Sequence, residues 1–364
     1  MNDFSASDRS HMARALALAE RGANTTAPNP RVGCVIAHDE QVLGEGWHVR
    51  AGEPHAEVFA LRAAGDRARG ATAYVTLEPC AHHGRTPPCA EALIAAGIAR
   101  VVAAVRDPHP LVIGRGFAML EAAGIRVETG LMEAEVRELN RGFLSRIERG
   151  RPWVRVKLAM SLDGCTALAN GESKWITSEA ARGDVSHWRA RSDALLTGAG
   201  TVRADDPHLT VRLAEPVDFL APIRVVLDGP GRLPASAKIF DAAAPTWLIR
   251  SPEAVAGDGV TAEAMTVPAI DGRLDLSAVM AQLAQRQINE VQVEAGATLS
   301  GALLRAGLVD ELLLYLAPVL LGDRGRPLFA GLDIATMAER LEFDLLETLP
   351  IGPDLRLLFR PRNR

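Results

Sequence analysis

The first half of the chain alternates short apolar runs with longer segments whose apolar residues recur at helical spacing. Runs at 32–37, 73–77 and 100–105 predict buried strands, and 41–46 predicts a hairpin partner for the first of them. Helices are predicted where apolar positions share one face, over 8–21, 55–67, 89–96, 115–123 and 132–147. Gly22 is expected to end the first helix in the left-handed conformation. Strands that alternate with helices predict an α/β layered domain with a largely parallel portion.

A second α/β pattern follows the segment 148–152, whose Gly, Pro and charged residues are typical of a linker. We therefore expect two domains, residues 1–148 and residues 149–364. The strands predicted in the second domain are 153–159, 193–197, 224–227, 246–249, 290–294 and 311–317. Its predicted helices are 178–191, 275–286 and 298–306, and the tail 341–360 predicts two antiparallel edge strands.

Composition narrows the class of protein. The 364 residues are 48% hydrophobic, which is enough for two large cores, and contain no apolar run long enough for a transmembrane helix. The polar segment 1–14 is unlike a signal peptide, so we expect a cytoplasmic protein that does not engage a membrane. Four cysteines do not make a disulfide framework. A net charge of −5 disfavours a nucleic-acid groove, whereas a small anionic substrate needs only one or two local cations.

The strongest chemical signal is His55-Ala56-Glu57 followed by Pro79-Cys80 and by Cys89. One His and two Cys can supply three ligands to a tetrahedral zinc ion and leave the fourth position for water. A His-x-Glu segment followed by Pro-Cys and a second Cys is typical of zinc nucleobase deaminases, in which the Glu moves protons and is not a ligand. Here eight residues separate the two cysteines, more than the usual two.

A structural zinc site or a pair of buried thiols is the alternative interpretation. The segment between the cysteines offers His82 and His83, either of which could complete a closed site with four ligands. A closed structural site has no use for Glu57, so the pattern favours catalysis. Cys34 and Cys165 are expected to be ordinary small core residues.

The second half carries weaker signals. Residues 293–301 lead from a buried strand through small residues into a helix, and the backbone N–H groups of such a turn can bind phosphate. Small residues at this kind of turn often serve packing alone. The segments 161–164 and 198–207 are interpreted as tight turns. These residues by themselves indicate a nucleotide-binding α/β domain and nothing narrower.

Longer motifs fall in both halves and in a consistent order. They are Pro28–Cys34, Gly52–Glu57, Thr76–Cys80, Gly84–Cys89, Ser161–Gly164, Gly171–Thr177, Asp205–Pro207, Leu209–Arg212 and Glu294–Gly296. With these motifs the chain resembles the bifunctional deaminase/reductase family of riboflavin biosynthesis over nearly its whole length. The eight-residue spacing between the cysteines is typical of that family.

The resemblance implies a fold and two successive reactions. The N-terminal domain is expected to be a cytidine-deaminase-like three-layer domain with zinc, and the C-terminal domain to be dihydrofolate-reductase-like with NADPH. The implied substrate is a small pyrimidine ribosylamine phosphate, which is deaminated on its ring before its ribosyl chain is reduced to ribityl. The family also implies a homodimer, for which the apolar stretch 312–321 is a candidate surface.

The resemblance also implies roles for individual residues. The zinc ligands are His55, Cys80 and Cys89, with Glu57 catalytic. Substrate contacts in the deaminase are Asn29, His48, Arg85 and Asp107, although Arg85 could instead be a solvated loop residue. NADP contacts are Ala159, Trp175, Thr201, Asp205, Gly296, Ala297, Thr298, Leu299, Ser300, Gly301 and Ala302. Substrate contacts in the reductase are Ser173, Arg189, Leu209, Arg212 and Glu294. Arg189 and Arg212 are candidate phosphate clamps, and no residue stands out as a proton donor.

Two positions depart from the family pattern, and two other classes of protein stay open. His109 stands where the family usually has Asn, and Ala81 where Ser is common. Neither change removes a metal ligand. The alternatives are a nucleic-acid deaminase with an added domain, which the acidic charge opposes, and a non-catalytic zinc protein with a nucleotide-sensing half, which Glu57 opposes.

Overall fold

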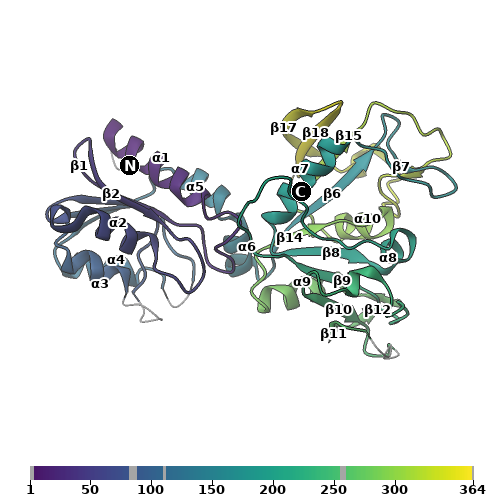
Figure 1. The fold of residues 1–364 in the computed structure, drawn as a ribbon, viewed down its shortest axis with the longest axis horizontal. Coiled ribbons are helices and arrows are strands. Elements are labelled where there is room, and N and C mark those ends of the chain that lie inside the picture. The colour runs from purple at the N-terminus through teal and green to yellow at the C-terminus, as the bar shows by residue number, and fades with distance from the viewer. Residues whose placement is uncertain (1–3, 82–87, 110–111, 255–259, 363–364) are drawn as a thin grey trace. The chain divides into compact units, whose positions relative to one another are not determined.

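The computed structural model describes residues 4–81, 88–109, 112–254 and 260–362 (Figure 1). The chain divides into two compact units, Met1–Arg149 and Gly150–Arg364, which are described separately below. The predicted domain boundary, between 148 and 149, lies one residue before this division. Within the described residues, no helix combines the length and the apolar character needed to cross a membrane.

The first unit is built on a five-stranded sheet with the order β2-β1-β3-β4-β5. The strands are β1 (Gly33–His38), β2 (Gln41–Trp47), β3 (Thr72–Leu77), β4 (Arg100–Val105) and β5 (Arg126–Thr129). β1 pairs antiparallel with β2 and with β3, whereas β3, β4 and β5 are parallel. The carboxyl ends of β3 and β4 therefore lie side by side, and the metal-ligand motif follows the first of them.

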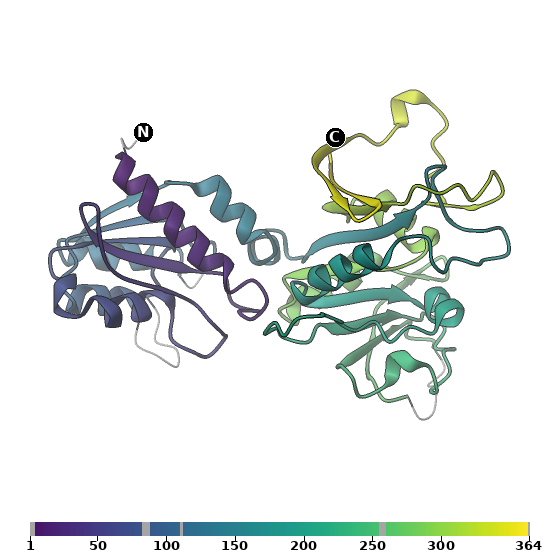
Figure 2. The ribbon, with the colours of Figure 1, turned by 45° about the horizontal axis from the view of Figure 1, so that its top comes forward.

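Helices cover both faces of this sheet and make three layers (Figures 1 and 2). α1 (Ala6–Glu20) and α5 (Glu133–Leu139) lie on one face, and α2 (Ala56–Ala64), α3 (Cys89–Ala95) and α4 (Arg115–Ala122) lie on the other. A short 3-10 turn, Gly65–Ala68, extends α2. The helix predicted over 132–147 is two helices, because Asn140 ends α5 and its side chain bonds the backbone N–H and C=O of Arg31 before α6 (Arg141–Arg149) begins.

Gly22 does not have the role that its position predicted. α1 ends at Arg21 in the ordinary helical conformation, and Gly22 is not left-handed. A Cβ at Gly22 would lie 2.6 Å from Thr26 Cγ2 and 2.9 Å from the His48 carbonyl oxygen. The residue is therefore small because the chain passes close to it, and the prediction of a left-handed cap is wrong.

The second unit holds a nine-stranded sheet with the order β11-β10-β9-β8-β14-β6-β15-β18-β17. Its strands are β6 (Trp153–Met160), β8 (Ala194–Gly198), β9 (Ile223–Leu227), β10 (Thr246–Arg250), β11 (Glu263–Thr266), β14 (Glu290–Val293), β15 (Glu311–Leu316), β17 (Phe343–Ile351) and β18 (Asp354–Pro361). Neighbours from β11 to β15 are parallel, and β18 is antiparallel to both β15 and β17. The two antiparallel strands predicted for the tail are confirmed.

Four helices and two small two-stranded sheets complete the described part of this unit. The helices are α7 (Glu179–Ala190), α8 (Ala199–Asp205), α9 (Leu276–Gln285) and α10 (Ala297–Arg305). The small sheets pair β7 (Cys165–Ala167) with β16 (Arg326–Pro327), and β12 (Ala269–Ile270) with β13 (Arg273–Leu274). Short 3-10 turns occupy Lys238–Phe240 and Met337–Glu339. α8 was expected to be a turn, since its two flanking glycines disfavour a helix, but Val202 is buried in an apolar cluster with Leu195.

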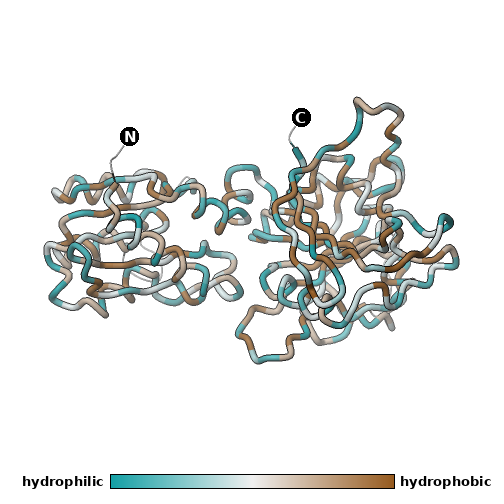
Figure 3. The backbone as a smooth tube through the Cα atoms, turned by 90° about the horizontal axis from the view of Figure 1, so that it is seen from above, coloured by the Kyte–Doolittle hydropathy of each residue, from teal (hydrophilic) through white to brown (hydrophobic). Residues whose placement is uncertain are grey.

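Each unit has its own apolar core, and the hydrophobic segments run along its strands (Figure 3). The apolar stretch proposed as a dimer surface belongs mostly to the second core. Leu312, Leu313, Leu314 and Tyr315 are buried in β15, which pairs on both sides. Their hydrophobicity is explained by that burial. Val319 and Leu320, near the end of the stretch, are exposed. The edge strand β17 exposes further apolar residues, Leu345, Leu346 and Leu349.

Asp8 fastens α1 to the sheet of the first unit. Its carboxylate accepts hydrogen bonds from Arg100 Nη1 at 2.7 Å and from the Tyr74 hydroxyl at 2.8 Å. Burial alone would raise the pKa of the Asp8 carboxyl, but the bonds from Arg100, from the Ser5 backbone and from Tyr74 outweigh it and lower this pKa well below 3.8. The folded state therefore binds the Asp8 proton less tightly than the unfolded chain does.

Because the folded pKa of Asp8 is depressed, its stabilisation is present above the unfolded pKa and is lost as the pH falls toward the folded pKa. We predict that Asp8→Asn reduces the free energy of unfolding of the first unit by about 1–3 kcal/mol at pH 7. The difference from the native chain should shrink below about pH 4. Hydrogen exchange of the α1 amides at several pH values measures it. Glu20→Gln, on the same helix, is the control, and equal pH dependence in both variants contradicts the prediction.

Candidate functional site

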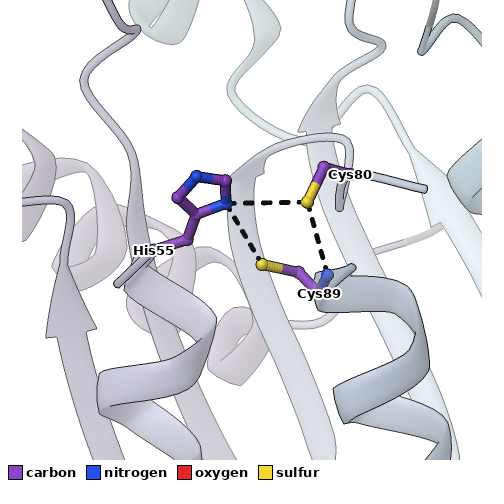
Figure 4. A group of neighbouring side chains, drawn as sticks. All are labelled: His55, Cys80 and Cys89. Carbon is purple, nitrogen blue, oxygen red and sulfur yellow. Dashed lines mark hydrogen bonds between the residues drawn. The ribbon is translucent and has the colours of Figure 1, made fainter. Parts of the chain in front are cut away.

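His55, Cys80 and Cys89 come together at the carboxyl end of β3 (Figure 4). His55 is the residue before α2, Cys80 follows β3, and Cys89 begins α3. The His55 Nδ1 atom lies 3.6 Å from Cys80 Sγ and 3.3 Å from Cys89 Sγ. The three residues that the sequence placed in one motif are thus neighbours in space.

The geometry of these three residues fits a zinc ion. The ligand atoms lie within 4.8 Å of one another. Bond lengths of about 2.0–2.3 Å in a tetrahedral site require ligand atoms about 3.5–3.8 Å apart, close to the distances found here. One nitrogen and two sulfur atoms are a donor set that zinc prefers. The described residues supply three ligands. His82 and His83, the alternative fourth ligands, lie outside the described residues.

The electrostatics of the cluster favour a thiolate. The Cys89 thiol lies within hydrogen-bonding range of Cys80 Sγ, and the Cys89 backbone N–H donates to that sulfur at 3.3 Å. The bond from the Cys89 side chain, followed by that from His55, lowers the pKa of the Cys80 thiol. Thiolate is the form of cysteine that binds metals. The hydrogen bond to Cys80, together with burial, raises the pKa of the Cys89 thiol, so the cluster without metal favours one thiolate, that of Cys80.

Glu57 lies beside the ligands and is 3% exposed. It is in the first turn of α2, two residues after His55. Burial raises the pKa of its carboxyl, although the nearby His55 acts in the opposite direction. Its Oε2 atom is buried and has no hydrogen-bond partner among the described residues. A buried carboxylate with a free oxygen and a raised pKa is suited to accept and return a proton.

Asn29 and His48 extend the cluster on the other side of His55. The Asn29 Nδ2 atom lies 3.1 Å from His48 Nε2, and His48 Nδ1 lies 3.2 Å from the Pro54 carbonyl oxygen. If the Nδ1–H group donates to Pro54, the Nε2 atom accepts from Asn29. The His48 and His55 ring centres are 5.3 Å apart. Burial lowers the pKa of His48, so its ring is neutral at pH 7.

Asp107 follows β4, and Arg85 falls outside the described residues. Asp107 is 8% exposed, and its Oδ1 atom accepts the backbone N–H of His109 at 2.8 Å. The Asp107 backbone N–H in turn donates to Glu78 Oε2 at 3.3 Å. Sequence reasoning gave Glu78 no role, although it belongs to the motif that ends at Cys80. An acidic residue directly after a largely buried strand was the signal for its structural importance.

The second unit has a cleft of about 2170 Å³ that gathers the predicted cofactor and substrate residues. The residues that line it include Ala159, Ser173, Trp175, Arg189, Thr201, Asp205, Leu209, Arg212, Glu294, Gly296, Ala297, Thr298, Leu299 and Ala302. Trp175 is 70% exposed and stacks under the Arg182 guanidinium at 4.4 Å. Predicted site residues that are up to about 140 positions apart in sequence therefore line one continuous cleft.

Ser300 and Gly301 are the two predicted cofactor residues that do not line the cleft. Ser300 is buried, and its hydroxyl lies 3.4 Å from the Ala295 carbonyl oxygen. A Cβ at Gly301 would lie only 2.1 Å from the Ala330 carbonyl oxygen. Both residues thus face the protein interior, where they pack α10 against the segments that contain Ala295 and Ala330.

Arg189 and Glu294 form a paired contact in the cleft. The Arg189 Nε and Nη2 atoms donate to the two Glu294 oxygens at 2.6 and 2.7 Å, and Nη1 donates to the Thr210 carbonyl at 2.7 Å. Burial alone would raise the pKa of the Glu294 carboxyl, but the charges of Arg189 and Lys157 outweigh it and lower this pKa to about 2. Arg212 is exposed and makes no side-chain hydrogen bond within the described residues, so it is the freer of the two candidate phosphate clamps.

Lys157 is a second residue that sequence reasoning missed. It lies on β6, in step with Ala159, and lines the same cleft. Burial lowers the pKa of its ammonium group, although the charge of Glu294 acts in the opposite direction. A lysine two residues before a predicted cofactor contact, in a strand otherwise apolar except for Arg155, was the available signal.

Both units match known protein families. Residues 5–105 match the family described as the cytidine and deoxycytidylate deaminase zinc-binding region, and residues 152–357 match the RibD C-terminal domain. The riboflavin biosynthesis protein RibD of Escherichia coli K12 is 52% identical over 96% of this chain and 98% of its own length. The RibD of Haemophilus influenzae is 47% identical over the whole of both chains. This chain belongs to the RibD family.

Solved structures agree with that assignment. The chain superimposes on Acinetobacter baumannii RibD, form 1, with a TM-score of 0.91 and 48% identity, covering 98% of this chain and 99% of the other. A Thermotoga maritima protein described as a diaminohydroxyphosphoribosylaminopyrimidine deaminase/5-amino-6-(5-phosphoribosylamino)uracil reductase gives a TM-score of 0.87 at 34% identity, with the same coverage. The predicted family, the α/β fold with a cytidine-deaminase-like first domain and the bifunctional class of enzyme are confirmed.

We predict that the purified chain carries about one zinc ion and that Cys80→Ala or Cys89→Ala removes it, because two remaining ligands hold zinc poorly. Metal content after dialysis, measured by mass spectrometry, tests this. Cys165→Ala, which changes a thiol in the other unit, is the control and should keep the metal. Zinc retained in full by the double variant Cys80→Ala/Cys89→Ala would show that the ion binds elsewhere.

Proposed function

We propose that this chain deaminates 2,5-diamino-6-(5-phosphoribosylamino)pyrimidin-4(3H)-one and then reduces the ribosyl chain of the product with NADPH, giving 5-amino-6-(5-phosphoribitylamino)uracil. The observation that carries the proposal is the placement of buried Glu57 beside the cluster of His55, Cys80 and Cys89. The cleft of the second unit supports the reductive half, since it brings the expected NADP and substrate contacts together.

In the deamination, His55, Cys80 and Cys89 would hold zinc, which would supply a water of lowered pKa near the ring carbon. Glu57 is placed to accept a proton through its free Oε2 and to deliver it to the ring nitrogen and then to the departing ammonia. Asn29 and neutral His48 orient the ring by hydrogen bonds at the edge of the site. Asp107 and Arg85 complete the substrate contacts in this proposal.

In the reduction, the turn Gly296–Leu299 at the start of α10 offers its backbone N–H groups to the cofactor phosphates. Thr201 and Asp205 are further NADP contacts in this proposal. Ser173, Leu209 and Arg212 contact the substrate, and Arg212 pairs with its phosphate. NADPH supplies the hydride. Hydride transfer leaves an electron pair on a heteroatom of the substrate, and that atom needs a proton. Glu294 has no proton to donate, because its pKa is about 2 and its carboxyl is ionised. The neighbouring Lys157 is the proposed proton donor.

We also propose that the chain is a homodimer that acts in the cytoplasm. The edge strand β17 exposes Leu345, Leu346 and Leu349, and exposed apolar strand edges are suited to a second copy of the same chain. All four cysteines are free, and a thiolate metal site requires a reducing compartment. Sedimentation equilibrium of the full chain distinguishes a dimer from a monomer.

Glu57→Gln tests the deamination. The amide cannot accept the water proton, so ammonia release from the pyrimidinone phosphate should fall by on the order of 10²-fold or more. Zinc content should stay the same, because Glu57 is not a ligand. NADPH-dependent reduction of the already deaminated intermediate, assayed separately, should also be unchanged, because it depends on the other unit. Near-normal deamination by Glu57→Gln contradicts the assigned role.

Lys157→Met tests the proton donor. The rate of NADPH oxidation with the deaminated intermediate should fall by about 10²-fold or more, while ammonia release in the first reaction is unaffected. In the native chain the reduction rate should fall as the pH rises through the Lys157 pKa, which lies below the ordinary 10.5. Lys238→Met, at another part of the cleft wall, is the matched control. A Lys157→Met variant that keeps the native rate and pH profile excludes Lys157 as the donor.

A further inference from the structure

Glu78 stands at the carboxyl end of β3, directly before Pro79 and the metal ligand Cys80. The side chain is 3% exposed. Its backbone N–H donates to the Val105 carbonyl at 2.9 Å, which extends the pairing of β3 with β4 beyond the last strand residue. The residue is therefore fixed where the two strands deliver their functional side chains.

The Glu78 carboxylate accepts at least three backbone hydrogen bonds from the connection between β4 and α4 and from the first turn of α4. Oε2 accepts from Asp107 N at 3.3 Å and from Gly114 N at 3.1 Å, and Oε1 accepts from Gly116 N at 3.0 Å. One side chain on β3 thus holds both ends of this connection, including the residue assigned to the substrate.

The start of α4 explains why a carboxylate is needed. Its cap residue, Gly114, is left-handed with φ 72° and has no side chain to receive the first helical N–H groups. Unpaired N–H groups at a buried helix start cost free energy, and a carboxylate is a favourable acceptor there. Glu78 therefore performs from another strand the capping that the helix's own sequence cannot provide.

The same helix start also touches the metal-ligand segment directly. A Cβ at Gly116 would lie 1.9 Å from the Pro79 carbonyl oxygen, so only glycine allows this backbone contact. The Pro79-Cys80 segment and the β4–α4 connection consequently meet without intervening side chains. A change in the bonds of Glu78 moves Asp107 relative to Cys80.

We propose that Glu78 is a positioning residue of the deaminase site, which sets the distance between the metal ligand Cys80 and the substrate contact Asp107. The inference rests on the proposed deamination. Glu78 touches neither the metal nor the substrate and acts through Asp107. Its loss should therefore weaken substrate binding and leave the metal in place.

Glu78→Gln keeps the shape but replaces one acceptor oxygen by an amide N–H₂ group, so at least one of the three bonds is lost. KM for the pyrimidinone phosphate should rise by between about tenfold and 10²-fold, with a smaller change in kcat. Zinc content and the separately assayed reduction should be unchanged. Glu121→Gln, an exposed acid on α4, is the control.

A double-mutant cycle with Asp107→Ala separates positioning from plain structural support. If Glu78 acts through Asp107, then Glu78→Gln has little further effect on KM in the Asp107→Ala background. Additive losses overturn the proposal. Should Glu78→Gln fold poorly, Glu78→Asp keeps the charge but retracts it by one methylene. A raised KM with full zinc in that variant supports the proposal, and a native KM overturns it. Absence of deamination in the native chain would instead refute the proposed function.

Discussion

Parallel strand pairing is the constraint on which both sites depend. When two neighbouring strands run in the same direction, the residues that follow them must emerge at the same edge of the sheet. β3 and β4 deliver Cys80 and Asp107 in this way, and β6 and β14 deliver Ala159 and Glu294. The chain carries out two different chemistries, but it uses the same geometric device to assemble each of them.

The zinc centre could be predicted from sequence because only a few residue types bind zinc or move protons beside it. The sequence contains few residues able to bind zinc, and four reactive ones lie near predicted strand and helix ends: His55, Glu57, Cys80 and Cys89. The structure confirms that the three predicted ligands are neighbours and supplies the distances between them. The cofactor cleft could not be predicted in this way. Small residues such as Gly296 look the same in a packing turn as in a phosphate site, and only the family resemblance indicated the difference.

The features that sequence reasoning missed share a physical cause, which is contact between distant segments. Asn140 breaks a predicted helix because it bonds Arg31, and Gly22 is small because His48 passes beside it. Glu78 caps a helix that begins 37 residues later. No local pattern announces such partners, since each of them is created by the folded sheet.

The Arg189–Glu294 pair bears on how the reductase cleft can be inhibited. Arg189 occupies one side of both carboxylate oxygens, and Gln292 Nε2 donates to Oε1 at 2.9 Å. A ligand therefore finds a carboxylate with few vacant lone pairs and a charge already balanced. A strongly basic group gains little there, whereas a neutral, planar N–H donor of the kind found on a uracil ring suits the remaining edge. If Glu294 contacts the substrate as proposed, it would therefore favour an uncharged heterocycle over a cation.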